Sequence, residues 1–175
     1  VVSYTLTENL DENTCQIQCE LNDGETSIMV EGEGVGTIDA LFDGLKSRLA
    51  GDYPSLESIR FADFDIEGLI SSDDGPETAT EAEAKATVGI RNSEDKDFEF
   101  EAKAPSVSRA GIQATVSAAE YFVNSERTYV RLHEILEHYR SEGRTDLVEK
   151  YTDLMSQVVE NTSYSEVVER IRKSM

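Results

Sequence analysis

Apolar and polar residues alternate along several short segments of the chain, and this period of two is typical of β-strands with one face toward a core. The clearest case is FEFEAKA, in which Phe98, Phe100 and Ala102 share one face and charged residues share the other. Polar turns at NDGE and NSEDKD separate neighbouring segments of this kind. The pattern predicts strands at residues 1–7, 14–21, 26–32, 58–66, 79–90 and 98–104.

Each group of three strands is followed by a segment in which apolar residues recur at helical spacing. The first helix is predicted at residues 37–50, where Thr37 can cap it. The second starts near Ser108 and continues through Leu136, either straight or with a bend. The apolar face of the first helix consists of Ile38, Leu41, Phe42, Leu45 and Leu49. The sequence therefore predicts an α+β fold of two β-β-β-α units, related by a pseudo-twofold axis, with antiparallel sheets covered by helices.

The breaks in these patterns predict the domain organisation. The first repeat covers residues 1–53 and the second covers residues 54–142, so that one domain spans residues 1–142. A C-terminal helical extension follows at 143–175, where a third helix and a short final helix are predicted. The acidic loop at 71–78 is long for a connection between strands, and we expect it to be mobile.

The charge of the chain restricts its partners. The net charge is −20, and such a chain repels nucleic acids and anionic membranes, so neither is expected as a partner. The acidity is otherwise explained by solubility. Cys15 and Cys19 lie four residues apart on a predicted strand, with Cα atoms roughly 13 Å apart, which is too far for a disulfide. We expect buried free thiols and a cytoplasmic protein.

Catalytic chemistry is not suggested by the residues present. His133 and His138 are five residues apart, which turns them about 140° away from each other on a helix, so that they cannot share a metal ion. Neither a Ser-His-Asp nor a Cys-His arrangement is indicated. We therefore expect no catalytic residues, no metal site and no cofactor in this chain.

A glycine-rich turn precedes the first helix, at Gly32, Gly34 and Gly36. The N–H groups at such a turn, at the positive end of a helix, attract a carboxylate or a phosphate. The third glycine of a dinucleotide fingerprint and the lysine of a phosphate-binding loop are both missing. The turn therefore indicates either an anion site or a tight connection between a strand and a helix.

Three segments resemble one known family. Residues 32–40 (GEGVGTIDA) are similar to a G-x-G-N-G-P-V-D-A turn, with Val35 for Asn and Thr37 for Pro. Residues 63–66 (DFDI) are similar to D-Y-x-V, and residues 110–115 match in part the D-x-x-x-A-S start of the second helix, with Ala110 for Asp. These segments and the order of the units resemble the C-terminal regulatory domain of the 2-isopropylmalate synthase and citramalate synthase family, the LeuA allosteric dimerisation domain. The resemblance covers about residues 1–125.

This resemblance implies a regulatory function. Domains of the family form homodimers and bind an end-product amino acid, leucine or isoleucine. Binding inhibits a catalytic (β/α)₈ barrel that condenses acetyl-CoA with a 2-oxo acid. The chain has no such barrel, so it is expected to be the regulatory part of an acyltransferase of this kind. The barrel is then a partner domain if the chain belongs to a longer protein.

An effector site for a branched-chain amino acid is expected at the glycine turn. Backbone N–H groups there suit the carboxylate of the ligand, and Asp63 or, as second choice, Asp39 suits its ammonium group. The expected effector-binding residues are Gly34, Val35, Gly36, Thr37, Ile38, Asp39, Asp63, Phe64, Ile66, Ser106 and Ser108. The alternative is a dimerisation module that keeps the fold and has lost the ligand.

We predict that dimerisation strengthens as salt rises. Two protomers of net charge −20 repel each other, so apolar contacts must hold the dimer, and salt screens the repulsion without weakening those contacts. Sedimentation equilibrium at increasing salt measures the change. A chain that stays monomeric at micromolar concentration in about 0.5 M salt, where the Debye length is roughly 4 Å, would contradict it.

Overall fold

The structure, a computed structural model, describes residues 1–22, 24, 26–69 and 83–160. The predicted acidic loop and the predicted final helix lie outside these residues. The strands are β1 (Ser3–Asn9), β2 (Thr14–Asn22), β3 (Ser27–Gly34), β4 (Arg60–Leu69), β5 (Glu83–Arg91) and β6 (Asp97–Ala104). The helices are α1 (Thr37–Leu49), α2 (Ser55–Ser58), α3 (Val107–Ser141) and α4 (Thr145–Glu160).

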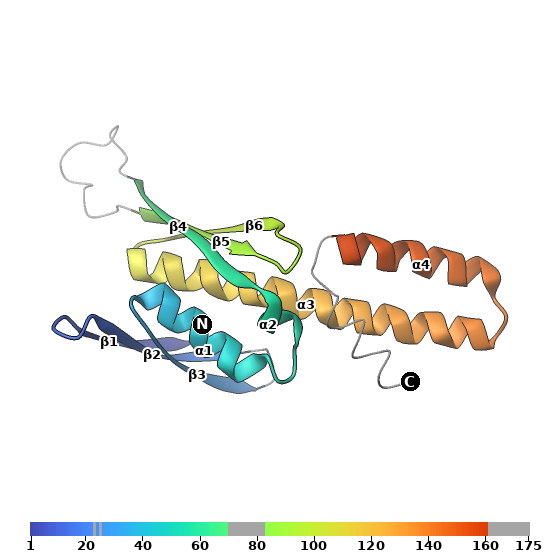
Figure 1. The fold of residues 1–175 in the computed structure, drawn as a ribbon, viewed down its shortest axis with the longest axis horizontal. Coiled ribbons are helices and arrows are strands. Elements are labelled where there is room, and N and C mark those ends of the chain that lie inside the picture. Colours follow the sequence, from blue (N-terminus) through green and yellow to red (C-terminus); the bar gives the residue numbers. More distant parts are fainter. Residues whose placement is uncertain (23, 25, 70–82, 161–175) are drawn as a thin grey trace.

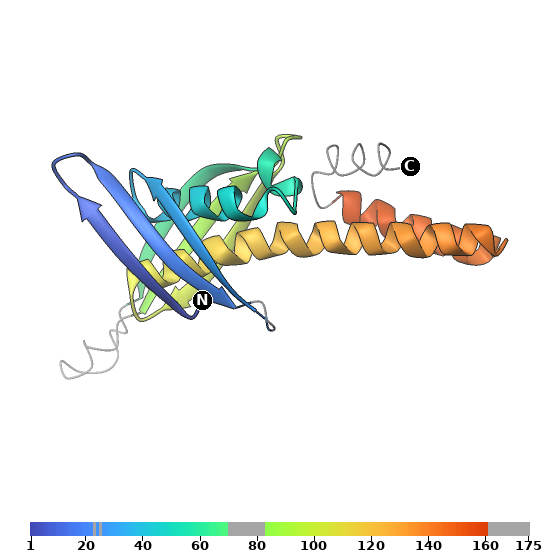
Figure 2. The same cartoon turned by 90° about the horizontal axis from the view of Figure 1, so that it is seen from below.

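The strands form two separate antiparallel sheets, in the orders β1-β2-β3 and β4-β5-β6. Helix α1 packs on β3 and β2, α3 packs on β5 and β6, and the two helices contact each other. Figures 1 and 2 show the result, a layer of two helices between the two sheets. The predicted α+β fold of two β-β-β-α units is confirmed, and its helices are shared between the sheets.

Alternation along the strands separates a buried face from a wet face, as predicted. On β2, Cys15, Ile17 and Cys19 are buried toward the helices. Between them Gln16 and Gln18 are exposed, and their side chains donate hydrogen bonds to glutamates on β3, at 3.4 and 3.2 Å. Both cysteines are free, and burial raises the pKa of each thiol. The prediction of buried free thiols is confirmed.

Helix α1 lies in backbone contact with β3. A Cβ atom at Gly32 would lie 1.9 Å from the carbonyl oxygen of Ala40, and one at Gly44 would lie 2.8 Å from the carbonyl oxygen of Glu31. Neither position therefore has room for a side chain. Two glycines, one on the strand and one on the helix, thus set the distance between α1 and its sheet.

Two hydrophobic clusters fill the space between the sheets, and α1 and α3 each contribute residues to both clusters. One face of α1 carries Leu41 and Leu45 into the cluster against β2 and β3. Its other face carries Ile38 and Phe42 into the cluster against β5. The opposite faces of α3 divide in the same way, with Ile112 in the first cluster and Phe122 in the second.

Helix α3 is a single helix of 35 residues that continues well beyond the sheets. Near its middle the carboxylate of Glu126 is buried and accepts a hydrogen bond from the backbone N–H of Ser55, at 3.0 Å. This contact fixes the start of the short helix α2 against α3. Helix α2 was not predicted from the sequence.

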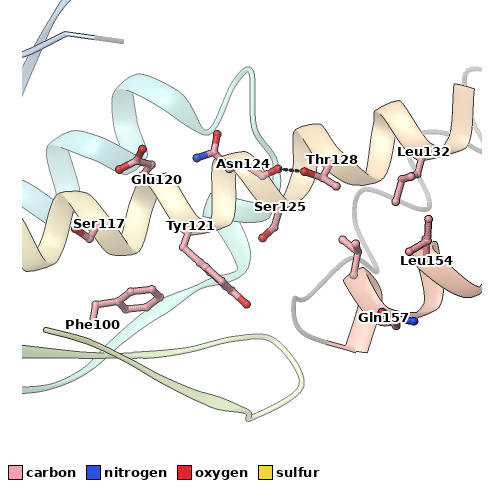
Figure 3. A pocket seen from close by; sticks show the side chains of 11 residues that line it. Phe100, Ser117, Glu120, Tyr121, Asn124, Ser125, Thr128, Leu132, Leu154 and Gln157 are labelled. Carbon is pink, nitrogen blue, oxygen red and sulfur yellow. Dashed lines mark hydrogen bonds between the residues drawn. The ribbon is translucent and has the colours of Figure 1, made fainter. Parts of the chain in front are cut away.

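The second half of α3 and α4 form a helical hairpin, here defined as residues 124–160, that projects from the body of the molecule (Figure 2). Within it the rings of Tyr139 and Tyr151 stack at 5.6 Å between centroids. An open groove of about 760 Å³ runs from Phe100 on β6 along one side of α3 to Leu154 on α4 (Figure 3). The side chains of Leu132 and Leu154 face each other across it.

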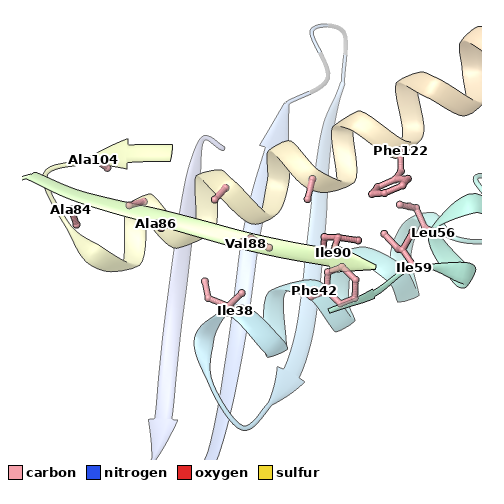
Figure 4. Packing of buried hydrophobic residues seen from close by; sticks show 13 residues of the cluster. Ile38, Phe42, Leu56, Ile59, Ala84, Ala86, Val88, Ile90, Ala104 and Phe122 are labelled. Carbon is pink, nitrogen blue, oxygen red and sulfur yellow. The ribbon is translucent and has the colours of Figure 1, made fainter. Parts of the chain in front are cut away.

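Helix α1 also meets the second sheet. Figure 4 shows Ile38 and Phe42 of α1 beside Val88 and Ile90 of β5. The ring of Phe42 lies 6.1 Å from that of Phe61 on β4, between centroids. The two repeats therefore share one interior instead of folding as separate units.

We predict that Gly32→Ala destabilises the fold by about 3 kcal/mol or more, because α1 must move off the sheet to admit a methyl group. Gly68→Ala on β4 is the matched control, since a Cβ atom there meets nothing within 4 Å. Its effect is expected to stay within about 1 kcal/mol. Denaturant unfolding monitored by circular dichroism measures both. Equal stabilities of the two variants would show that the contact of α1 with β3 is not close-packed.

Candidate functional site

The glycine turn between β3 and α1 holds a carboxylate. The Oδ2 atom of Asp39 accepts a hydrogen bond from the backbone N–H of Val35, at 3.1 Å. A Cβ atom at Gly34 would lie 2.5 Å from the same oxygen, so only glycine leaves room for it. Asp39 in the first turn also suits the positive end of the helix dipole. The turn therefore presents a carboxylate that its own backbone holds in place.

The first turn of α1 has no side-chain cap. Gly36 is the N-cap residue, so the expectation that Thr37 caps the helix is wrong, and Thr37 is instead the first helical residue. The backbone N–H of Ala40 donates to the carbonyl of Gly36, at 2.9 Å. The first N–H groups of a helix have no acceptor within the helix. Those of α1 follow the exposed residue Val35 in the chain.

Helix α3 starts at the same end of the molecule as α1 (Figure 4). Its N-cap is Ser106, whose Oγ accepts a hydrogen bond from the backbone N–H of Arg109, at 3.2 Å. Ser108, also expected in the site, lies in the first turn of α3. The serines that the sequence places in the effector site therefore lie at the second helix start.

Ile38, Phe64 and Gly111 meet where the first turns of α1 and α3 approach each other. A Cβ atom at Gly111 would lie 2.6 Å from Cδ1 of Ile38 and 3.3 Å from Cζ of Phe64. Ile38 is buried at this point. Ile66, which lies on the same face of β4 as Phe64, is 36% exposed. The structure thus brings together an apolar surface from α1, α3 and β4.

Asp63 lies on the other face of β4. It pairs with Gly89, and Phe64 pairs with the buried Val88, so Phe64 points toward the helices and Asp63 points away from them. Its Oδ1 atom accepts the backbone N–H of Phe64, at 2.8 Å. Within one protomer, Asp63 and Asp39 therefore do not line one pocket.

A groove along α1 was not predicted from the sequence. A groove of about 590 Å³ runs along α1 from Asp39 to Gly51, between α1 and the start of β4. Its floor contains Phe42 and Phe61, and the ammonium group of Lys46 donates to the carbonyls of Glu57 and Ile59, at 3.2 and 3.0 Å. The spacing of Asp39, Phe42 and Lys46 along one helix face was the available signal.

A metal centre has no ligand set in the part of the chain that the structure describes, where no three His, Cys, Asp or Glu residues lie together. His138 instead lies 3.6 Å from the carboxylate of Glu142, one turn further along. Within the same residues, no helix is long and apolar enough to cross a membrane.

Comparison with known protein families identifies the family of this chain. The family model of the LeuA allosteric (dimerisation) domain matches residues 2–123. This range contains all six strands, α1, α2 and the first half of α3, and it ends where the projecting hairpin begins. A search of curated proteins finds no match.

Proposed function

Because the chain belongs to the LeuA allosteric (dimerisation) domain family, we propose that it senses a branched-chain amino acid, leucine or isoleucine. The family assigns a regulatory role and dimerisation. The proposal adds the effector and its consequence, feedback inhibition of a 2-isopropylmalate synthase-like acyltransferase in the cytoplasm. It rests on one observation above all, the Asp39 carboxylate that the glycine turn holds at the start of α1.

The start of α1 suits the carboxylate of an amino acid. The chain has a net charge of −20 and repels anions in general, so an anion site has to be made locally. The N–H groups at Gly34, Gly36 and Thr37 and the positive end of the helix dipole supply such a site. Gly36 provides no side-chain cap, so no capping side chain of that residue competes with a ligand for the first N–H groups of α1.

The same place offers partners for the rest of the ligand. The Asp39 carboxylate is held beside the turn and can accept hydrogen bonds from an ammonium group. Ile38, Phe64 and Ile66 supply an apolar surface for a branched side chain. Since Asp63 points away from the helices, the geometry favours Asp39 as the partner of the ammonium group within one protomer.

One observation favours the alternative, a dimerisation module without a ligand. Ile38 is 8% exposed and fills the space between Gly111 and Phe64. Effector binding at that point requires the Ile38 side chain to move or the ligand to bind at its edge. A module that had lost its ligand would keep such a filled contact.

We predict that isothermal titration calorimetry detects binding of leucine or isoleucine, and that Asp39→Asn weakens it by well over about tenfold, because the ammonium group loses its charged partner. Asp63→Asn is the matched control. It makes the same change of charge at a carboxylate on the face of β4 that points away from the helices. Its affinity is expected to equal that of the unchanged chain.

The other outcomes are equally informative. Loss of affinity in Asp63→Asn alone would assign the ammonium group to Asp63, as the sequence first suggested. Absence of heat with leucine, isoleucine and valine would reject the sensor and favour the ligand-free dimerisation module.

A further inference from the structure

The negative charge of the chain is concentrated in the family-matched body. Residues 1–123 carry 26 Asp and Glu against 8 Lys and Arg, a net charge of −18, whereas residues 124–175 carry 10 against 8, a net charge of −2. Exposed like charges repel over a Debye length of about 8 Å at physiological salt. Two copies of this chain therefore repel each other least through the part that lies beyond the family match.

The hairpin in this part has more apolar surface than its two helices cover. On α4 the apolar residues form a stripe about 140° wide at 100° per residue, which is wider than the seam that one neighbouring helix covers. The stripe consists of Leu147, Val148, Tyr151, Leu154, Met155, Val158 and Val159. Each of these is only half-buried, and among the described residues of α4 none is fully buried.

Among the described residues, part of this half-buried apolar surface lines the groove of Figure 3. On α3 it includes Leu132 and, one turn away on the same side, Ile135, both half-buried. On α4 it includes Leu154, with the exposed Thr128 of α3 at the rim. Arg131, which pairs with Glu134, and Lys150 are both exposed on the hairpin, so its surface charges are of mixed sign.

We propose that this face of the hairpin is a self-association surface, which pairs with the same face of a second copy of the chain. Two hairpins that meet in this way form a four-helix bundle, in which the wide stripe of α4 contacts its own α3 and the partner. A twofold axis makes the contact isologous, so a single face completes itself. This contact lies outside residues 2–123 and is additional to the one that the family match implies.

The charge distribution favours a second copy as the partner. A basic partner would bind the body, where the negative charge lies, and a nucleic acid or an anionic membrane would be repelled by it. A dimerisation domain already brings a second copy near, so that the pairing of the hairpins becomes effectively intramolecular and needs only a modest apolar contact.

Sedimentation equilibrium of the full chain tests the proposal. Leu154→Glu places a charge in the face. Thr128→Arg adds bulk at an exposed rim position, where the threonine hydroxyl donates to the carbonyl of Asn124 one turn earlier in the same helix. Each is expected to raise the dissociation constant of the dimer at least about tenfold. Leu10→Glu, at a residue 87% exposed in the turn between β1 and β2, is the matched control. It is expected to change that constant by less than about twofold.

Unchanged dissociation constants in both hairpin variants would overturn the proposal, and so would an equal loss in the Leu10→Glu control. Circular dichroism of each variant, diluted to the monomer, separates pairing from folding. A hairpin variant that lowers the melting temperature of the monomer and leaves the dissociation constant unchanged would show that the face is covered within the protomer, which also rejects a second copy as its partner.

Discussion

The contact between the backbone of β3 and α1 is the constraint on which the rest of this structure depends. With no side chain at Gly32 or Gly44 the helix lies directly on the strand. Its far side then reaches the second sheet, where Phe42 meets Phe61. Small residues on α3, among them Gly111, let the two helices lie side by side in one layer. A bulkier residue at either glycine would separate the sheets and open both hydrophobic clusters.

Much of the fold could be predicted from the sequence, because each strand and helix is amphipathic with its own period. FEFEAKA buries its phenylalanines in part and exposes its glutamates, as alternation requires. The continuous course of α3 is also local in origin, since neither glycine nor proline occurs between Gly111 and Gly143. Helix α2 could not be predicted, because four residues show no period and its start is fixed by the distant Glu126. The stacking of helices between two sheets likewise depends on contacts between the repeats.

The candidate site, like the fold, could be predicted from the sequence only in part. The sequence could place Asp39 beside the glycine turn, because the residues that hold it lie within a few positions. It could not predict the face of Asp63, because β4 carries an irregularity between Phe61 and Asp63. A regular strand would put these two residues on one face, and the extra residue places Phe61 with Phe64 instead. The groove beneath α1 was missed because a helix of one repeat and a strand of the other form it.

The unbroken course of α3 has a mechanical consequence. At 1.5 Å per residue its 35 residues make a rod about 52 Å long, with one end beside the glycine turn and the other at the tip of the hairpin. A tilt of about 5° at the first end would displace the tip by about 4–5 Å, because a helix of this kind bends little. Any tilt of α3 against the sheets is therefore magnified at the tip of the hairpin, in proportion to its distance from Gly111.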